Sequence, residues 1–155
     1  MNLYINSANE NWVVDRFIKE FREFGKITTT RFLFNADLIW IIAPWTWRKI
    51  PIRYLKRNKV VCTIHHIDED KFDNIAKKEF LERDLIVDQY HVISESTYKQ
   101  ISNLTTKQIK IIPFWVNQNI WFEIKNRDQI LNKYKLDSKK FYIGSFQRDT
   151  EGSDL

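Results

Sequence analysis

The sequence predicts an α/β fold, in which a doubly wound, mainly parallel sheet of Rossmann-like type carries helices on both faces. Short β-branched runs alternate along the chain with segments of helical periodicity, and this rhythm is typical of parallel strands joined by right-handed crossovers. One run, residues 38–43, is continuously apolar, as a central strand covered on both faces requires. A chain of 155 residues with 43% hydrophobic content can bury one sizeable core.

Each element is predicted from its own pattern. Apolar residues from Val13 to Phe24 repeat at helical spacing, and Gly25 follows where a helix ends. Pro44 ends the central strand, and Pro51 suits the first turn of a short basic helix. In order, the expected elements are strand 3–5, helix 13–24, strand 27–30, strand 37–43, a helix from 51, strand 59–64, a helix around 72–80 with Ile75 and Phe80 in its apolar stripe, strand 90–93, a helix capped by Ser94, strand 108–112, helix 127–134 and strand 141–144.

Composition excludes several classes of site. The three glycines stand far apart, so neither a Walker A loop nor a dinucleotide-binding glycine fingerprint is present. The single cysteine, Cys62, allows no internal disulfide and no cysteine-rich zinc site, and its apolar surroundings predict a small buried side chain. Motifs of serine hydrolases, zincins and thioredoxins are also missing from the sequence. We expect the chain to bind no cofactor.

Charge and hydropathy bear on location and partners. The N-terminal residues lack a signal-peptide pattern, and the longest apolar run is shorter than the about 20 residues that a membrane span needs. A net charge of +5 permits an anionic partner such as a nucleotide or a phospholipid surface. We expect a cytoplasmic protein, or one peripheral on the inner face of the membrane. We expect no nucleic-acid binding, which would require a broader basic surface than the one basic and aromatic segment at residues 45–59.

The reactive groups are expected in the loops that follow the predicted strands, because ligands of open parallel sheets bind beyond the carboxyl ends of the strands. These loops comprise residues 7–11, 44–48, 65–70, 94–96 and 113–117. His91 lies within a strand rather than in a loop, and we interpret it as a packing residue.

A polar segment, residues 63–70, directly follows a predicted buried strand. His65 can donate a hydrogen bond to a phosphate or accept a proton, whereas the side chain of His66 should point the other way. The alternative is that His65 only bonds a neighbouring carbonyl. Asp68 and Asp70 match a short D-x-D pattern that holds a divalent cation with a nucleotide diphosphate, but their favoured interpretation is the start of the next helix. A zinc site through both histidines is weaker still, so no metal site is predicted.

A basic and aromatic segment spans residues 45–59. Cationic side chains beside interfacial tryptophans suit an anionic membrane surface, but the same pattern fits a solvated helix face with both tryptophans in the core. The sequence leaves these two interpretations open. The residues of the membrane interpretation are Trp45, Trp47, Arg48, Lys49, Arg53, Lys56 and Arg57.

Three segments in a fixed order carry a resemblance to a known family. Residues 60–65 are a strand ending in threonine-x-histidine, residues 92–98 are a valine-x-serine strand-to-helix turn, and residues 109–117 contain an isoleucine-proline run. Together they resemble the N-terminal half of group 1 glycosyltransferases, retaining enzymes of the two-domain GT-B fold that build bacterial surface polysaccharides and glycolipids. Phe122 and residues 128–144 resemble the entry to the second domain of that family.

The resemblance implies transfer of a sugar from a nucleotide-diphosphate sugar to a glycan or lipid-linked acceptor, with retained anomeric configuration and no obligatory metal. It places His65 against the acceptor and the transferred sugar, and it assigns Arg148 to the donor diphosphate. Residues 1–122 are then the acceptor-binding domain, and residues 123–155 are an interdomain segment with the start of a truncated nucleotide-sugar-binding domain. The expected acceptor-binding residues are Asn9, Asn11, Trp45, His66, Ser94, Glu95 and Trp115.

The sequence departs from the family pattern at three points. The loop at residues 7–11 lacks the glycines that allow close backbone approach to a ligand. Phe114 and Trp115 replace the asparagine-glycine pair of the proline motif. The two glutamates that the family has near its nucleotide site are missing from these 155 residues, so we expect half of an enzyme that is inactive as this fragment.

Overall fold

The computed structural model describes residues 1–142, which divide between two compact units. The first unit comprises Met1–Val116 and the second comprises Asn117–Leu155. The boundary predicted at residue 122 therefore lies within the second unit.

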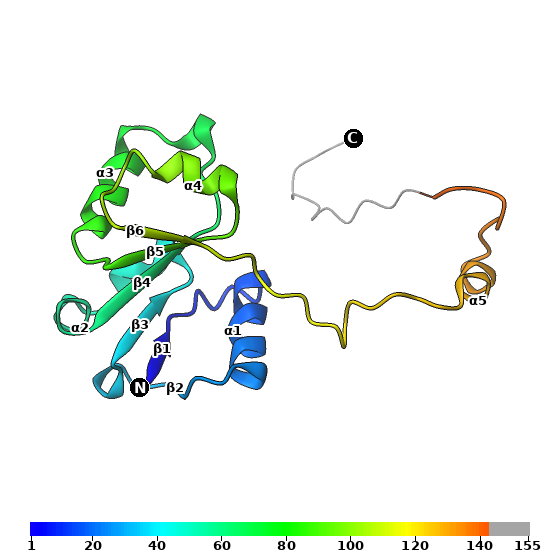
Figure 1. Cartoon of the computed structure of the whole chain (residues 1–155), viewed down its shortest axis with the longest axis horizontal. Helices are drawn as coiled ribbons and strands as arrows, with labels where there is room; N and C mark the ends of the chain where they lie inside the picture. The colour runs from blue at the N-terminus through cyan, green and yellow to red at the C-terminus, as the bar shows by residue number, and fades with distance from the viewer. Residues whose placement is uncertain (143–155) are drawn as a thin grey trace. The chain divides into compact units, whose positions relative to one another are not determined.

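The first unit is built on a sheet of parallel strands. These are β1 (Leu3–Ile5), β2 (Thr29–Thr30), β3 (Leu38–Ile41), β4 (Lys59–Ile64), β5 (Gln89–Val92) and β6 (Gln108–Ile111). All neighbouring pairs are parallel, and the six strands follow the order β2-β1-β3-β4-β5-β6 (Figure 1). The predicted α/β class with a parallel sheet is confirmed, and the architecture is consistent with a Rossmann-like fold.

Side chains alternate between the two faces of the sheet and supply two cores. In β3, Ile39 and Ile41 enter the larger core, whereas Leu38 and Trp40 pack against the smaller one, as the two-residue period of a strand requires. Cys62 of β4 is fully buried in the larger core, so the prediction of a small buried side chain is confirmed. Burial also raises the pKa of its thiol to about 12, which keeps the group neutral.

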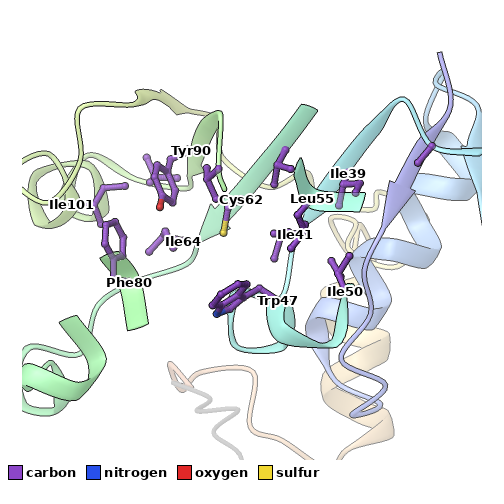
Figure 2. Packing of buried hydrophobic residues seen from close by; sticks show 14 residues of the cluster. Ile39, Ile41, Trp47, Ile50, Leu55, Cys62, Ile64, Phe80, Tyr90 and Ile101 are labelled. Atoms are coloured by element: carbon purple, nitrogen blue, oxygen red, sulfur yellow. The ribbon is translucent and has the colours of Figure 1, made fainter. Parts of the chain in front are cut away.

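Helices cover both faces. The helix α1 (Val13–Phe24) packs on the smaller core through Val14, Phe17 and Ile18. On the opposite face lie α2 (Ile52–Arg57), α3 (Asn74–Asp84) and α4 (Glu95–Ile101). Their residues Leu55, Phe80 and Ile101 enter the larger core (Figure 2). Three short 3-10 helices complete the unit: η1 (Leu33–Asn35), η2 (Pro44–Lys49) and η3 (Glu69–Lys71).

The helix ends follow local chemistry. The hydroxyl of Ser94 caps α4 by accepting a hydrogen bond from the Thr97 N–H, as predicted. Gly25 ends α1, and its N–H donates to the Phe21 carbonyl at 2.8 Å. A Cβ atom at Gly25 would lie 2.4 Å from that carbonyl oxygen, so close approach explains the glycine.

The apolar stripe predicted for α3 is wrong in part. Ile75 is 76% exposed, whereas Phe80 is buried as expected. The helix begins at Asn74 behind the capping carboxylate of Asp73, and it turns Phe80 and Arg83 toward the sheet. These two residues are three positions apart and so share one face of the helix.

The second unit contains α5 (Arg127–Lys133), which confirms the predicted helix at residues 127–134. Phe141 and Tyr142 belong to no strand, and the rest of the predicted strand 141–144 lies outside the described residues. Within residues 1–142, no helix combines the length and the apolar character that crossing a membrane requires.

Candidate functional site

The strand order reverses between β1 and β3, since β2 lies beyond β1 and β4 lies beyond β3. The crevice at such a switch point is where open α/β sheets bind ligands. Asn6, which directly follows β1, fixes the two loops that meet there. Its amide donates to Thr46 Oγ1 and, at 3.4 Å, to the Ala43 carbonyl, while the Ala43 N–H donates back to Asn6 Oδ1 at 3.3 Å.

The loop after β1 brings a carboxylate to the crevice. The indole Nε1 of Trp45 donates to Glu10 Oε1 at 2.9 Å, and the Trp45 side chain remains 44% exposed. Glu10 lies between Asn9 and Asn11, which both adopt left-handed backbone angles, with φ of 56° and 53°. The sequence prediction chose these two asparagines and missed Glu10.

Asn9 and Asn11 face a different space from Glu10. They line a cavity of about 550 Å³ together with Lys19, Arg22 and Arg31. Trp45 does not line that cavity. Its hydrogen bond to this loop, within the part of the chain that the structure describes, is the one to Glu10.

His65 stands at the carboxyl end of β4 beside this crevice. Its Nε2 donates to the Ile42 carbonyl at 2.8 Å. In the neutral ring the proton is therefore on Nε2, and Nδ1 is the hydrogen-bond acceptor. The ring is half-buried, and its centroid lies 6.2 Å from that of Trp45. The hydrogen bond to a neighbouring carbonyl that the sequence offered as the alternative is therefore made by Nε2. Nδ1 remains available to a ligand.

Burial holds the pKa of His65 below its ordinary value of 6.5, against an opposing effect of the hydrogen bond to Ile42. The nearby His66 and His91 lower the pKa of His65 further. The imidazole is consequently neutral at pH 7, and Nδ1 can accept a hydrogen bond or a proton.

Phe114, from the loop after β6, completes the cluster. Its ring stacks on His65 with centroids 5.5 Å apart, and on Phe17 of α1 at 4.0 Å. The adjacent Trp115, predicted to contact an acceptor, is instead bound to α1, where its Nε1 donates to Glu20 Oε2 at 2.8 Å. Phe114 is thus the residue of this loop that stacks on the histidine. We define the switch-point cluster as Glu10, Trp45, His65 and Phe114.

His66 and Ser94 lie around the same strand ends. His66 lines a cavity of about 250 Å³ that His65 does not line, so the two histidines point apart as predicted. Ser94 is the cap of α4, and Thr97 one turn later donates to the His65 carbonyl at 3.1 Å. Glu95 is exposed in the first turn of that helix. The cap therefore positions the backbone of His65.

His91 belongs to a buried network that is fully satisfied. Trp40 Nε1 donates to Thr63 Oγ1 at 2.8 Å, and the Thr63 hydroxyl donates to His91 Nδ1 at 2.9 Å. His91 Nε2 in turn donates to the Ile112 carbonyl at 2.7 Å. Its interpretation as a packing residue is confirmed.

The acidic segment after His66 supports its structural interpretation. Asp68 occupies the N-cap position of η3 without a side-chain capping bond, and the next α-helix is capped by Asp73. The Asp68 carboxylate accepts from Lys71 Nζ at 2.9 Å, and this bond lowers the pKa of Asp68. Asp70 is exposed within the same 3-10 helix. Within residues 1–142, no cluster of three or more histidine, cysteine or acidic side chains is arranged to hold a metal ion.

The basic and aromatic segment divides into an inner and an outer side. Trp47 is only 8% exposed and packs in the larger core (Figure 2), which corrects its assignment to a membrane surface. The reason is the 3-10 helix η2, whose three residues per turn direct Pro44 and Trp47 inward and Trp45 and Arg48 outward. The cations of the segment remain exposed, and Arg48 pairs with Glu82 at 2.6 Å.

Comparisons of the chain with protein-family models, curated proteins and solved structures gave no match. Arg148, expected at a donor diphosphate, lies outside the described residues. The functional argument therefore depends on the geometry of the switch-point cluster.

Proposed function

We propose that this chain supplies the acceptor-binding domain of a retaining glycosyltransferase, which moves a sugar from a nucleotide-diphosphate sugar to a glycan or lipid-linked acceptor. The supporting observation is the switch-point cluster, where the exposed indole of Trp45 lies beside the Glu10 carboxylate and the neutral imidazole of His65. A pyranose ring has an apolar face and a rim of hydroxyl donors, and this cluster offers a partner to each. The ordered motifs that end in His65 and Ser94 support the same assignment.

In this proposal His65 acts on the acceptor hydroxyl. Its Nε2 is held by the Ile42 carbonyl, so the ring presents Nδ1 in a fixed tautomer as the hydrogen-bond acceptor. Glu10 accepts from a second hydroxyl while its other contact fixes Trp45. The Thr97 bond to the His65 carbonyl keeps the end of the strand in place beneath the reacting group.

The donor diphosphate is assigned to a second domain, as the family resemblance implies. The loop between β1 and α1 offers backbone N–H groups at a helix N-terminus, a place suited to phosphate. Those groups are already used, because Asp15 accepts from the N–H of Asn9 at 3.3 Å and of Glu10 at 2.9 Å. The hydroxyl of Ser7 also donates to Asp15 at 2.5 Å, and this bond is the largest cause of the lowered pKa of that carboxyl.

Saturation-transfer NMR of the chain with a panel of neutral methyl glycosides tests the proposal. We expect at least one glycoside to bind, and Trp45→Ala to weaken that binding by about tenfold or more. Trp121→Ala is the matched control, because Trp121 is 60% exposed and lies in the second unit. Equal binding by the two variants contradicts the proposal. Tight binding of a nucleotide-diphosphate sugar that needs Mn²⁺ and Asp70 instead supports the metal-dependent alternative.

A second candidate function is docking on an anionic membrane. Lys49, Arg53, Lys56 and Arg57 are exposed and form no ion pair with the described residues, and Ile52 between them is 51% exposed. Co-sedimentation with phosphatidylserine vesicles at low salt tests it. Arg53→Glu should reduce binding about fivefold or more, since each basic residue near the surface contributes about 1 kcal/mol. Absence of binding to these vesicles removes this candidate.

A further inference from the structure

Arg83 of α3 is a buried cation without a buried counter-charge. Its side chain is 7% exposed, and no ion pair joins it to any carboxylate of residues 1–142. Its Nη1 donates a long hydrogen bond of 3.4 Å to the Pro44 carbonyl, and its guanidinium lies over the Phe80 ring. Its Nε has no hydrogen-bond partner among the described residues. A guanidinium in this condition is costly, because burial removes water and one long hydrogen bond and one ring contact replace it only in part.

Glu79, one turn before Arg83 on α3, forms no ion pair with it, and the two acidic residues beside Arg83 in the sequence are bonded elsewhere. Glu82 pairs with Arg48 at 2.6 Å, and Asp84 accepts from the Thr105 hydroxyl at 2.6 Å. Cys62 in the core below is a neutral thiol, since burial raises its pKa to about 12. No carboxylate of the described residues pairs with Arg83, so its guanidinium can still pair with an anion.

Arg83 lines the cavity of about 250 Å³ at the carboxyl end of β4. Three features of the walls describe its ligand. Trp45, Phe72 and Phe80 give it apolar surfaces, and His66 adds a polar side chain. Its acidic residues are Asp68, whose carboxylate pairs with Lys71 at 2.9 Å, and Glu79. Trp45 belongs both to this cavity and to the switch-point cluster, so a ligand that contacts one can extend to the other.

We propose that this cavity binds the anionic group of an acidic sugar, with Arg83 as the counter-charge. The ligand carries an oxyanion, either a carboxylate or a phosphate ester, on a ring that packs against Trp45. The identification of the ring as a sugar rests on the proposed function, whereas the oxyanion site rests on Arg83 alone. An acceptor with an acidic unit next to the sugar that receives the transfer fits both sites.

Isothermal titration of the full chain at low ionic strength tests this proposal. The probes are glucuronic acid, its uncharged methyl ester, glucose 6-phosphate, glucose and inorganic phosphate. We expect at least one acidic sugar to bind about tenfold or more tightly than glucose, and a bound glucuronic acid to bind better than its methyl ester. The preferred anion then distinguishes a carboxylate from a phosphate ester. Equal affinity for charged and uncharged probes overturns the proposal without any variant.

Variants separate the anion site from the sugar site. Arg83→Met should weaken binding of the acidic sugar about thirtyfold or more, and it should raise the unfolding temperature of the free protein because it removes an unpaired buried charge. Lys78→Met, at an exposed cation of the same helix that forms no ion pair with the described residues, is the control and should change neither result. An unchanged affinity in Arg83→Met overturns the anion site. If the unaltered chain binds none of the sugars but binds inorganic phosphate, and Arg83→Met weakens that phosphate binding, the anion site is retained and the proposed function is overturned.

Discussion

Two histidines contact the same aromatic ring, Phe114, and differ in what their nitrogens do. His65 stacks on that ring at 5.5 Å and His91 meets it edge-on at 5.6 Å. Both nitrogens of His91 are hydrogen-bonded within a buried network, whereas His65 uses Nε2 alone and lies half-exposed at the end of its strand.

The difference separates structural from functional polar groups in this fold. A buried polar side chain costs least free energy when each donor and acceptor is hydrogen-bonded, and a fully bonded group has no donor or acceptor left for a ligand. The network around His91 meets this requirement, so it holds the sheet together. In the switch-point cluster, Nδ1 of His65 and the exposed ring face of Trp45 remain free to bind.

The largest expected effect is on stability at His91. His91→Ala leaves the Thr63 hydroxyl and the Ile112 carbonyl without their partner and opens a cavity, so we expect a loss of about 2–4 kcal/mol in the free energy of unfolding. His65→Ala removes one hydrogen bond at a half-exposed position and should cost about 1 kcal/mol. Urea unfolding followed by circular dichroism measures both. Equal losses in the two variants contradict the division between the two histidines.

A smaller effect is expected at the carboxylate of the switch-point cluster. Glu10→Gln keeps an oxygen for the Trp45 indole but removes the charge that strengthens a hydrogen bond to a sugar hydroxyl. We expect glycoside affinity to fall about fivefold, from a loss of about 1 kcal/mol, with no change in the unfolding midpoint. Glu23→Gln on the exposed side of α1 is the matched control. If Glu23→Gln lowers the glycoside affinity equally, the effect comes from the change in net charge, and the role given to Glu10 is contradicted.

Protonation should act on both histidines in the same pH range. Burial holds the pKa of His65 and of His91 below the ordinary value of 6.5, so the unfolded chain binds protons more readily than the folded one. The contribution to stability is full above pH 6.5 and decreases as the pH falls toward the folded-state pKa values. Urea midpoints between pH 8 and pH 5 measure this decline.

Replacing one histidine separates the two contributions. His65→Gln should reduce the pH dependence of stability and leave the part that belongs to His91. Glycoside binding to the unaltered chain should weaken over the same range, because protonation removes the lone pair on Nδ1. Binding that strengthens as the pH falls contradicts the assignment of His65 as a hydrogen-bond acceptor.

The sequence predicted the elements with strong local signals and missed contacts between distant loops. Strand β4 and helix α1 have the predicted limits, because their periodicity is clear and a glycine follows the helix. Glu10 bonds to Trp45 across 35 positions, and no local pattern reports such a contact. Phe114 likewise meets His65 only because β6 and β4 end at the same edge of the sheet.

Other misses concern helix geometry. The alternation of exposed and buried tryptophans at residues 45 and 47 depends on a 3-10 helix, and the sequence did not predict that helix type. Arg83 is three positions after Phe80, so the two residues lie on one face of the helix and both are buried. An apolar stripe does not include Arg83, because the residue is charged.

The smallest expected effect on stability concerns the acidic segment at the surface. Asp68 and Lys71 are paired with each other, as the groups of the His91 network are, but an ion pair exposed to water adds little to the free energy of unfolding. We expect Asp68→Asn to leave the urea midpoint unchanged and Mn²⁺ to give no shift in the unfolding temperature of the unaltered chain. A shift with Mn²⁺ that disappears in Asp70→Ala contradicts the helix-start interpretation. It also moves the search for a catalytic group from His65 to this segment.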